Sequence, residues 1–121
     1  MYLPMTLTLA NVTLDCADAG RLGAFWAAAL GRPLDEELSE AFASIGRGSA
    51  ERPIWLFLQV PEGKSAKNRM HVDLEADDRA LEVERLLGLG ATQVTEKDEW
   101  GVQWSVLLDP EGNEFCVAGP H

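Results

Sequence analysis

Hydrophobic and polar positions alternate at the start of the chain and then recur at helical spacing. Residues from about Leu7 to Cys16 alternate in the manner of a strand, whose apolar face carries Val12, Leu14 and Cys16. Asp18 can cap a helix, and apolar residues recur at helical spacing from there to Leu30. Gly31 and Pro33 then end the predicted helix.

Three further strands are predicted in the first half of the chain. Two short strands are expected near residues 34–38 and 41–45, and a third, rich in large apolar side chains, at residues 54–60. The polar segment of residues 61–68 has no periodicity and is predicted to connect this half to the next.

The second half of the chain repeats the first. Residues 11–18 align with residues 71–78 at an offset of 60, and each segment leads into a helix-like stretch that ends on Leu-Gly. After a one-residue slip the match continues at an offset of 59, which aligns Phe57 with Cys116. The repeated elements are a strand near residues 70–76, a helix capped by Asp77 or Asp78, and strands near residues 91–95, 102–108 and 114–118.

A repeat of this length is typical of a duplicated small αβ module. We therefore predict an α+β fold built from two pseudo-symmetric βαβββ modules, at about residues 5–62 and 68–119, within a single domain of residues 1–121. Their curved sheets should enclose a shared cleft.

Composition and charge narrow the possible partners. The chain has 121 residues, 46% hydrophobic and 25% charged, which is ordinary for one globular domain. Its net charge of −10 disfavours nucleic acid and anionic membranes and favours cationic or neutral partners. With two cysteines, no apolar run long enough for a membrane span and no leader-like segment after Met1, we expect a cytoplasmic protein.

The polar faces of the two opening strands should look into the cleft, because the apolar faces must be covered by helices. These polar positions are Asn11, Thr13 and Asp15 in the first module and His71, Asp73 and Glu75 in the second. Three carboxylates near one cleft favour a positively charged guest.

Aromatic and sulfur-containing residues give further candidates. Trp55, Trp100 and Trp104 either line a pocket for planar or cationic guests or pack between strands, whereas Trp26 belongs to the helix core. Cys116, aligned with Phe57, should share the concave face, where an apolar setting makes a thiol a poor nucleophile.

His71 is the histidine that falls inside a predicted element, since His121 is the terminal residue. His71 could act as an acid or base, and with Asp73 two positions along the same strand it could also touch a metal ion. That pair is a weak metal signal without a third ligand.

Three segments together resemble the glyoxalase/bleomycin-resistance/dioxygenase, or vicinal oxygen chelate, superfamily, especially its small single-domain glyoxalase-like branch. They are residues 14–18 with Phe25-Trp26 and Leu30-Gly31, residues 68–74, and residues 109–117. The resemblance implies paired βαβββ modules and often a homodimer.

Metalloenzymes of this superfamily bind a divalent ion through the first and last strands of each module. The resemblance places those ligand positions at Asn11, Phe57, His71 and Cys116. A shift of two residues in the alignment of the first module's last strand would replace Phe57 by Gln59. Only His71 matches the usual ligand types, so we predict no metal and no cofactor.

We therefore predict a metal-free protein that binds a cationic or neutral aromatic compound in an acidic, tryptophan-lined cleft. One alternative is a divalent-metal-dependent lyase, isomerase or dioxygenase that uses His71 with Cys116 or Gln59. Another is a metal-free enzyme with His71 as general acid or base, which makes His71 the candidate catalytic residue. The predicted ligand-binding residues are Asn11, Asp15, Trp55, Phe57, Gln59, His71, Asp73, Trp104 and Cys116.

Overall fold

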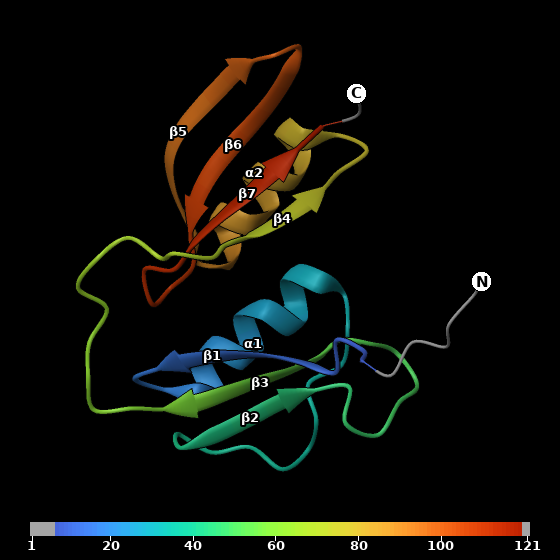
Figure 1. The fold of residues 1–121 in the computed structure, drawn as a ribbon, viewed down its shortest axis with the longest axis vertical. Coiled ribbons are helices and arrows are strands. Elements are labelled where there is room, and N and C mark those ends of the chain that lie inside the picture. Colours follow the sequence, from blue (N-terminus) through green and yellow to red (C-terminus); the bar gives the residue numbers. More distant parts are fainter. Residues whose placement is uncertain (1–6, 120–121) are drawn as a thin grey trace. The chain divides into compact units, whose positions relative to one another are not determined.

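The computed structural model describes residues 7–119, and the chain forms two compact units (Figure 1). The first unit spans Met1–Pro61 and the second Glu62–His121. Each unit contains one helix and one small mixed sheet, so the predicted α+β class is confirmed. In the described part of the chain no helix is both long and apolar enough to span a membrane.

The first unit is a three-stranded sheet with one helix. Its elements are β1 (Asn11–Cys16), α1 (Ala19–Leu30), β2 (Phe42–Ile45) and β3 (Ile54–Gln59). The strand order is β1-β3-β2, in which β1 runs parallel and β2 antiparallel to β3.

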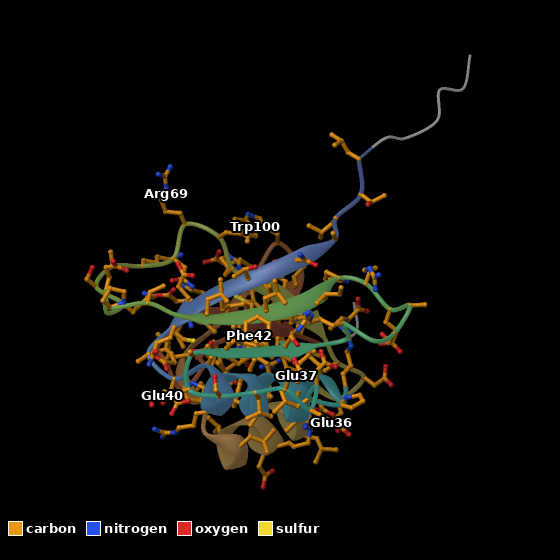
Figure 2. The ribbon with its side chains drawn as sticks, turned by 90° about the horizontal axis from the view of Figure 1, so that it is seen from below. Glu36, Glu37, Glu40, Phe42, Arg69 and Trp100 are labelled. Carbon is orange, nitrogen blue, oxygen red and sulfur yellow. The ribbon has the colours of Figure 1, made fainter. Side chains whose placement is uncertain are left out.

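The strand predicted at residues 34–38 is reduced to one bridge, between Leu34 and Ile45. The next residue, Asp35, receives hydrogen bonds at its carboxylate from the Ser44 hydroxyl, at 2.7 Å, and from the Arg47 backbone N–H, at 3.1 Å. Glu36 and Glu37 follow in the loop that leads to β2 (Figure 2). Adjacent carboxylates are better solvated in a loop than paired in a sheet, which explains why the ladder stops.

Helix α1 packs closely on one face of the first sheet. Trp26, at 1% exposure, stacks on Trp55 with ring centroids 5.1 Å apart. The approach depends on Gly23, since a Cβ there would lie 3.0 Å from the Cβ of Ala43 and 3.3 Å from the Phe57 ring. The apolar core of this unit therefore lies between α1 and the side chains of Trp55 and Phe57.

The second unit has the predicted βαβββ order. Its elements are β4 (Val72–Glu75), α2 (Arg79–Leu89), β5 (Thr92–Glu99), β6 (Val102–Leu108) and β7 (Glu114–Ala118). The strand order is β4-β7-β6-β5, with β4 parallel to β7 and the other neighbours antiparallel.

The two helices begin in the same way. The Asp18 carboxylate accepts the backbone N–H of Arg21, and the Asp78 carboxylate accepts that of Leu81, both at 3.1 Å. Each aspartate satisfies an N–H that the first helical turn leaves without a partner.

The hairpin between β5 and β6 turns through Trp100-Gly101, both with positive φ (+55° and +75°). Two positive φ values characterise the tight hairpin turn that usually contains Asn-Gly. A left-handed backbone costs a residue with a Cβ about 1–2 kcal/mol. Tryptophan is thus an unfavourable residue for the first position of this turn.

Asp109 organises the turn between β6 and β7. Asp109 is 3% exposed, and its carboxylate accepts hydrogen bonds from the backbone N–H groups of Glu111, at 2.9 Å, and Asn113, at 3.0 Å. The Asn113 side-chain amide also donates to both carboxylate oxygens. One buried carboxylate therefore fixes the loop that sets the register of β7 against β6.

We expect Asp109→Ala to lower the free energy of unfolding by about 2–4 kcal/mol, because the N–H groups of Glu111 and Asn113 lose a charged acceptor. Urea denaturation followed by circular dichroism measures the loss. Asp98→Ala is the matched control, since the structure gives Asp98 an exposed hydrogen bond from Gln103, and it should change stability by less than about 0.5 kcal/mol. Equal stability of the two variants would contradict the role of Asp109.

Candidate functional site

The sheet ladders correct the alignment of the two repeats. Thr13 pairs with Leu56 in the first sheet, and its repeat equivalent Asp73 pairs with Cys116 in the second. Leu56, and not Phe57, is therefore the counterpart of Cys116, at an offset of 60. The apparent slip comes from the helices, because α1 has 12 residues and α2 has 11.

A one-residue error in register reverses the face to which every side chain points. The expectation that Trp55 and Phe57 lie on the open face is consequently wrong. Both share the face of Val12 and Leu14, which α1 covers, and both are buried. Burial under a helix excludes Trp55 and Phe57 from an open ligand surface.

Gln59 also belongs to the α1 side of its strand, at the end of the ladder opposite Cys16. Its side-chain amide donates to the carbonyl of Ala17 at 2.9 Å, which ties β3 to the start of α1. Gln59 therefore does not lie on the open face, and the alternative alignment that makes it a metal ligand there is wrong.

The open face of the first unit is mixed in character. Asn11 and Asp15 are exposed there, and their cross-strand neighbours are Ile54 and Leu58. Phe42 of β2, opposite Leu58, lies on the same face (Figure 2). Leu56, which the corrected register places at the ligand position of the last strand in place of Phe57, has no metal-binding atom.

The open face of the second unit carries a pocket of about 410 Å³. It brings together four of the predicted site residues, His71, Asp73, Trp104 and Cys116. The pocket is also lined by Lys67, Val102, Val106, Glu114 and Ala118. Sequence analysis missed these, although the period-two pattern of Val102, Trp104 and Val106 along β6 places all three on one face.

Three potential ligand groups meet at one end of this pocket. Nδ1 of His71, the residue directly before β4, lies 3.2 Å from Oδ1 of Asp73 within that strand. Cys116 lies opposite Asp73 on β7, and one donor atom each from His71, Asp73 and Cys116 all lie within 4.8 Å of one another. The neighbouring strand therefore adds Cys116 as a third potential ligand group to the pair His71 and Asp73.

The Cys116 thiol is held in its protonated form. Burial raises its pKa to about 11, and the negative charge of Asp73 and a hydrogen bond to its carboxylate act in the same direction. Lys67 opposes the shift. A protonated thiol is a weak nucleophile, which agrees with the expectation from the sequence.

Glu114 has its charge compensated within the second unit. Burial acts to raise its pKa, but hydrogen bonds from the Asn68 backbone N–H, at 2.9 Å, and from Lys64, at 3.1 Å, hold that pKa below its usual value. The pocket lining also contains Lys67. The negative charge available to a guest in this pocket thus comes mainly from Asp73.

The other end of the pocket is aromatic and aliphatic. Trp104 stands between Val102 and Val106 on the same face of β6. Trp100 stacks on it from the hairpin turn, with ring planes 11° apart and centroids 6.1 Å apart. The site therefore joins an apolar surface to a small group of polar, ionisable side chains.

The metal site that the resemblance implies fits this chain only in part. In the first unit Asn11 is a weak ligand and Leu56 is none, so the arrangement with ligands from both modules does not fit. In the second unit His71, Asp73 and Cys116 offer nitrogen, oxygen and sulfur, a donor set that suits zinc and similar ions.

Comparison with known proteins finds one family model that covers residues 11–118, the glyoxalase-like domain. No curated protein matches the chain significantly in sequence.

Solved structures share the fold. A glyoxalase/bleomycin resistance protein/dioxygenase family enzyme from Burkholderia phytofirmans PsJN is 21% identical with a TM-score of 0.73, over 93% of this chain and 98% of that one. The bleomycin-binding protein of Streptomyces verticillus is 15% identical with a TM-score of 0.64, over 98% and 100% of the two chains. The fosfomycin resistance protein FosX of Mesorhizobium loti is 12% identical with a TM-score of 0.70, over 98% and 95%.

The environment of Cys116 predicts slow alkylation by iodoacetamide in a Cys16→Ala background. With a pKa of about 11, only about one thiol in a thousand is ionised at pH 8. The rate should therefore rise about tenfold per pH unit up to about pH 11, whereas an ordinary thiol levels off near pH 9.

Asp73→Asn should lower the pKa of Cys116 and accelerate alkylation at pH 8, because it removes the neighbouring negative charge. Asp77→Asn, which replaces an exposed carboxylate outside this pocket, should leave the rate unchanged. A rate that levels off near pH 9 in the Cys16→Ala protein would show that the thiol is not perturbed.

Proposed function

The chain belongs to the glyoxalase-like domain family, and from this premise we propose that it binds a small aromatic compound, neutral or cationic, on the open face of its second unit. The observation that carries the proposal is the pocket in which Trp104 and two valines adjoin His71 and Asp73. Ligand sites are typically concave, mostly apolar and equipped with a few polar groups that fix orientation.

The size and lining of the pocket support an aromatic guest. Its volume of about 410 Å³ falls within the range of small-molecule sites, about 300–1,000 Å³. The Trp104 side chain offers the aromatic surface for a planar ring. In this proposal the ring lies against Trp104 and Val106, and a polar substituent reaches His71 or Asp73.

The charges that line the pocket suit neutral guests and do not exclude cationic ones. Lys64 compensates Glu114, and Lys67 lies in the lining, so Asp73 is the main free negative charge of the pocket. The net charge of −10 over the chain adds a general attraction for cations. One of the structural neighbours is a bleomycin-binding protein, which supports small-molecule binding by this fold.

A divalent-metal-dependent enzyme, a lyase, isomerase or dioxygenase, is the second candidate. It is favoured by the close approach of His71, Asp73 and Cys116, which would hold the ion. A bound divalent ion would supply Lewis-acid polarisation of a substrate oxygen. In the absence of an ion, the same His71 with its Asp73 partner at 3.2 Å would be placed to act as a general acid or base.

The proposal includes a homodimer in the cytoplasm. The family resemblance supports the dimer, and Cys16 and Cys116, neither of which forms a disulfide, agree with a reducing compartment.

Binding of aromatic compounds is expected to be saturable when the protein is titrated with neutral and cationic single-ring and fused-ring probes and followed by calorimetry. Trp104→Ala should weaken the best probe about tenfold or more, because it removes the aromatic surface of the pocket. Leu81→Ala, which truncates an exposed side chain on α2, is the matched control and should bind like the unmodified protein. A panel in which no probe binds would overturn the proposed function.

Titration with Co²⁺ distinguishes the second candidate from the first. An ion held by Cys116 should produce the near-ultraviolet absorption of a cobalt–thiolate bond at one ion per chain, and Cys116→Ser or His71→Ala should reduce or remove it. Absence of the band with the unmodified protein would contradict the metal candidate. Any reaction found without metal should then be abolished by His71→Ala.

A further inference from the structure

Trp100 is the most conspicuous side chain that the description of the pocket leaves without a role. It is 87% exposed, at the tip of the β5–β6 hairpin (Figure 2). An indole this exposed contributes little to a core. The fold therefore gives no packing reason for tryptophan at this position.

The backbone conformation at Trp100 is a second reason why tryptophan is unexpected at this position. Its φ of +55° lies in the left-handed region, which residues with a Cβ rarely adopt. Asparagine or glycine would suit this turn better. A bulky residue retained in a strained turn is a reason to look for a function.

The position of the indole indicates what that function is. Trp100 stacks on Trp104, and Trp104 lines the pocket. The two rings are nearly parallel, and a centroid separation of 6.1 Å corresponds to an offset stack rather than to rings that lie directly over one another. Full face-to-face overlap is thus absent, and each indole leaves part of its aromatic surface uncovered.

We propose that Trp100 contacts the ligand and extends the aromatic wall formed by Trp104, so that the site takes a planar compound with at least two fused or conjugated rings. This inference rests on the proposed function, because it concerns the same pocket. A single ring covers only Trp104. A wider planar system reaches from His71 and Asp73, across Trp104, to the hairpin tip.

The test compares three probes by isothermal titration calorimetry with the full chain: p-cresol with one ring, 2-naphthol with two and proflavine, a cation, with three. Trp100→Asn should weaken 2-naphthol and proflavine about three- to tenfold, the loss expected for one aromatic contact. It should change p-cresol binding less than twofold.

Asparagine separates a loss of contact from a loss of folding. Because Asn tolerates positive φ, the Trp100→Asn protein should unfold at the same temperature as the unmodified chain or a higher one. The matched control is Val94→Thr, which removes another exposed apolar side chain from β5 and should leave all three affinities unchanged.

Equal affinities of Trp100→Asn and the unmodified protein for 2-naphthol and proflavine would overturn the inference. If p-cresol still binds in that case, the proposed function stands and only the role of Trp100 falls. Absence of binding by all three probes to the unmodified chain would overturn both. If sedimentation shows that Trp100→Asn dissociates an oligomer while probe affinities are unchanged, Trp100 is a contact between chains and the inference is wrong.

Discussion

Packing of each helix on one face of its own sheet is the constraint from which the rest of the structure follows. Successive side chains of a strand point to opposite faces of the sheet. The residues that face the helix therefore also determine which residues lie on the open face. In the second unit the apolar residues Val72, Leu74, Phe115 and Val117 lie on the helix side. The opposite side is therefore left with His71 and Asp73, which would be costly to bury unpaired, and with Cys116 beside them.

The sequence alone was sufficient for the class of the fold, the repeat and both helix starts, because Asp18 and Asp78 cap helices by local chemistry. It was also sufficient for the placement of His71 and Asp73 on one open face, which depends only on alternation along a short strand, whereas it left Trp104 undecided between a pocket and the packing between strands. The sequence did not correctly predict the face of the sheet on which Trp55 and Phe57 lie. Both alternating sets of side chains in β3, Trp55 with Phe57 and Leu56 with Leu58, are large and apolar, so alternation alone does not say which set faces the helix. The register of β3 against β1 depends on pairing between strands that are distant in the sequence, and no local pattern records it.

The two units have the same core architecture but different chemistry on their open faces. Leu56 stands where the second unit has Cys116, and Asn11 stands where it has His71. Phe42, opposite Leu58, occupies the place of Trp104, opposite Ala118. The positions under the helices are apolar in both units, since a polar residue there would destabilise the core, whereas the open positions are not under this packing constraint.

The protonated state of Cys116 has a consequence for the chemical durability of the pocket. Peroxides attack thiolates far faster than thiols, and a sulfur that stays protonated is correspondingly slow to form a sulfenic acid. Burial, together with the carboxylate of Asp73, raises the pKa of Cys116, and a high pKa should therefore also slow its oxidation. A surface shaped in this way would keep its affinity for a guest under conditions that inactivate proteins with exposed, acidic cysteines.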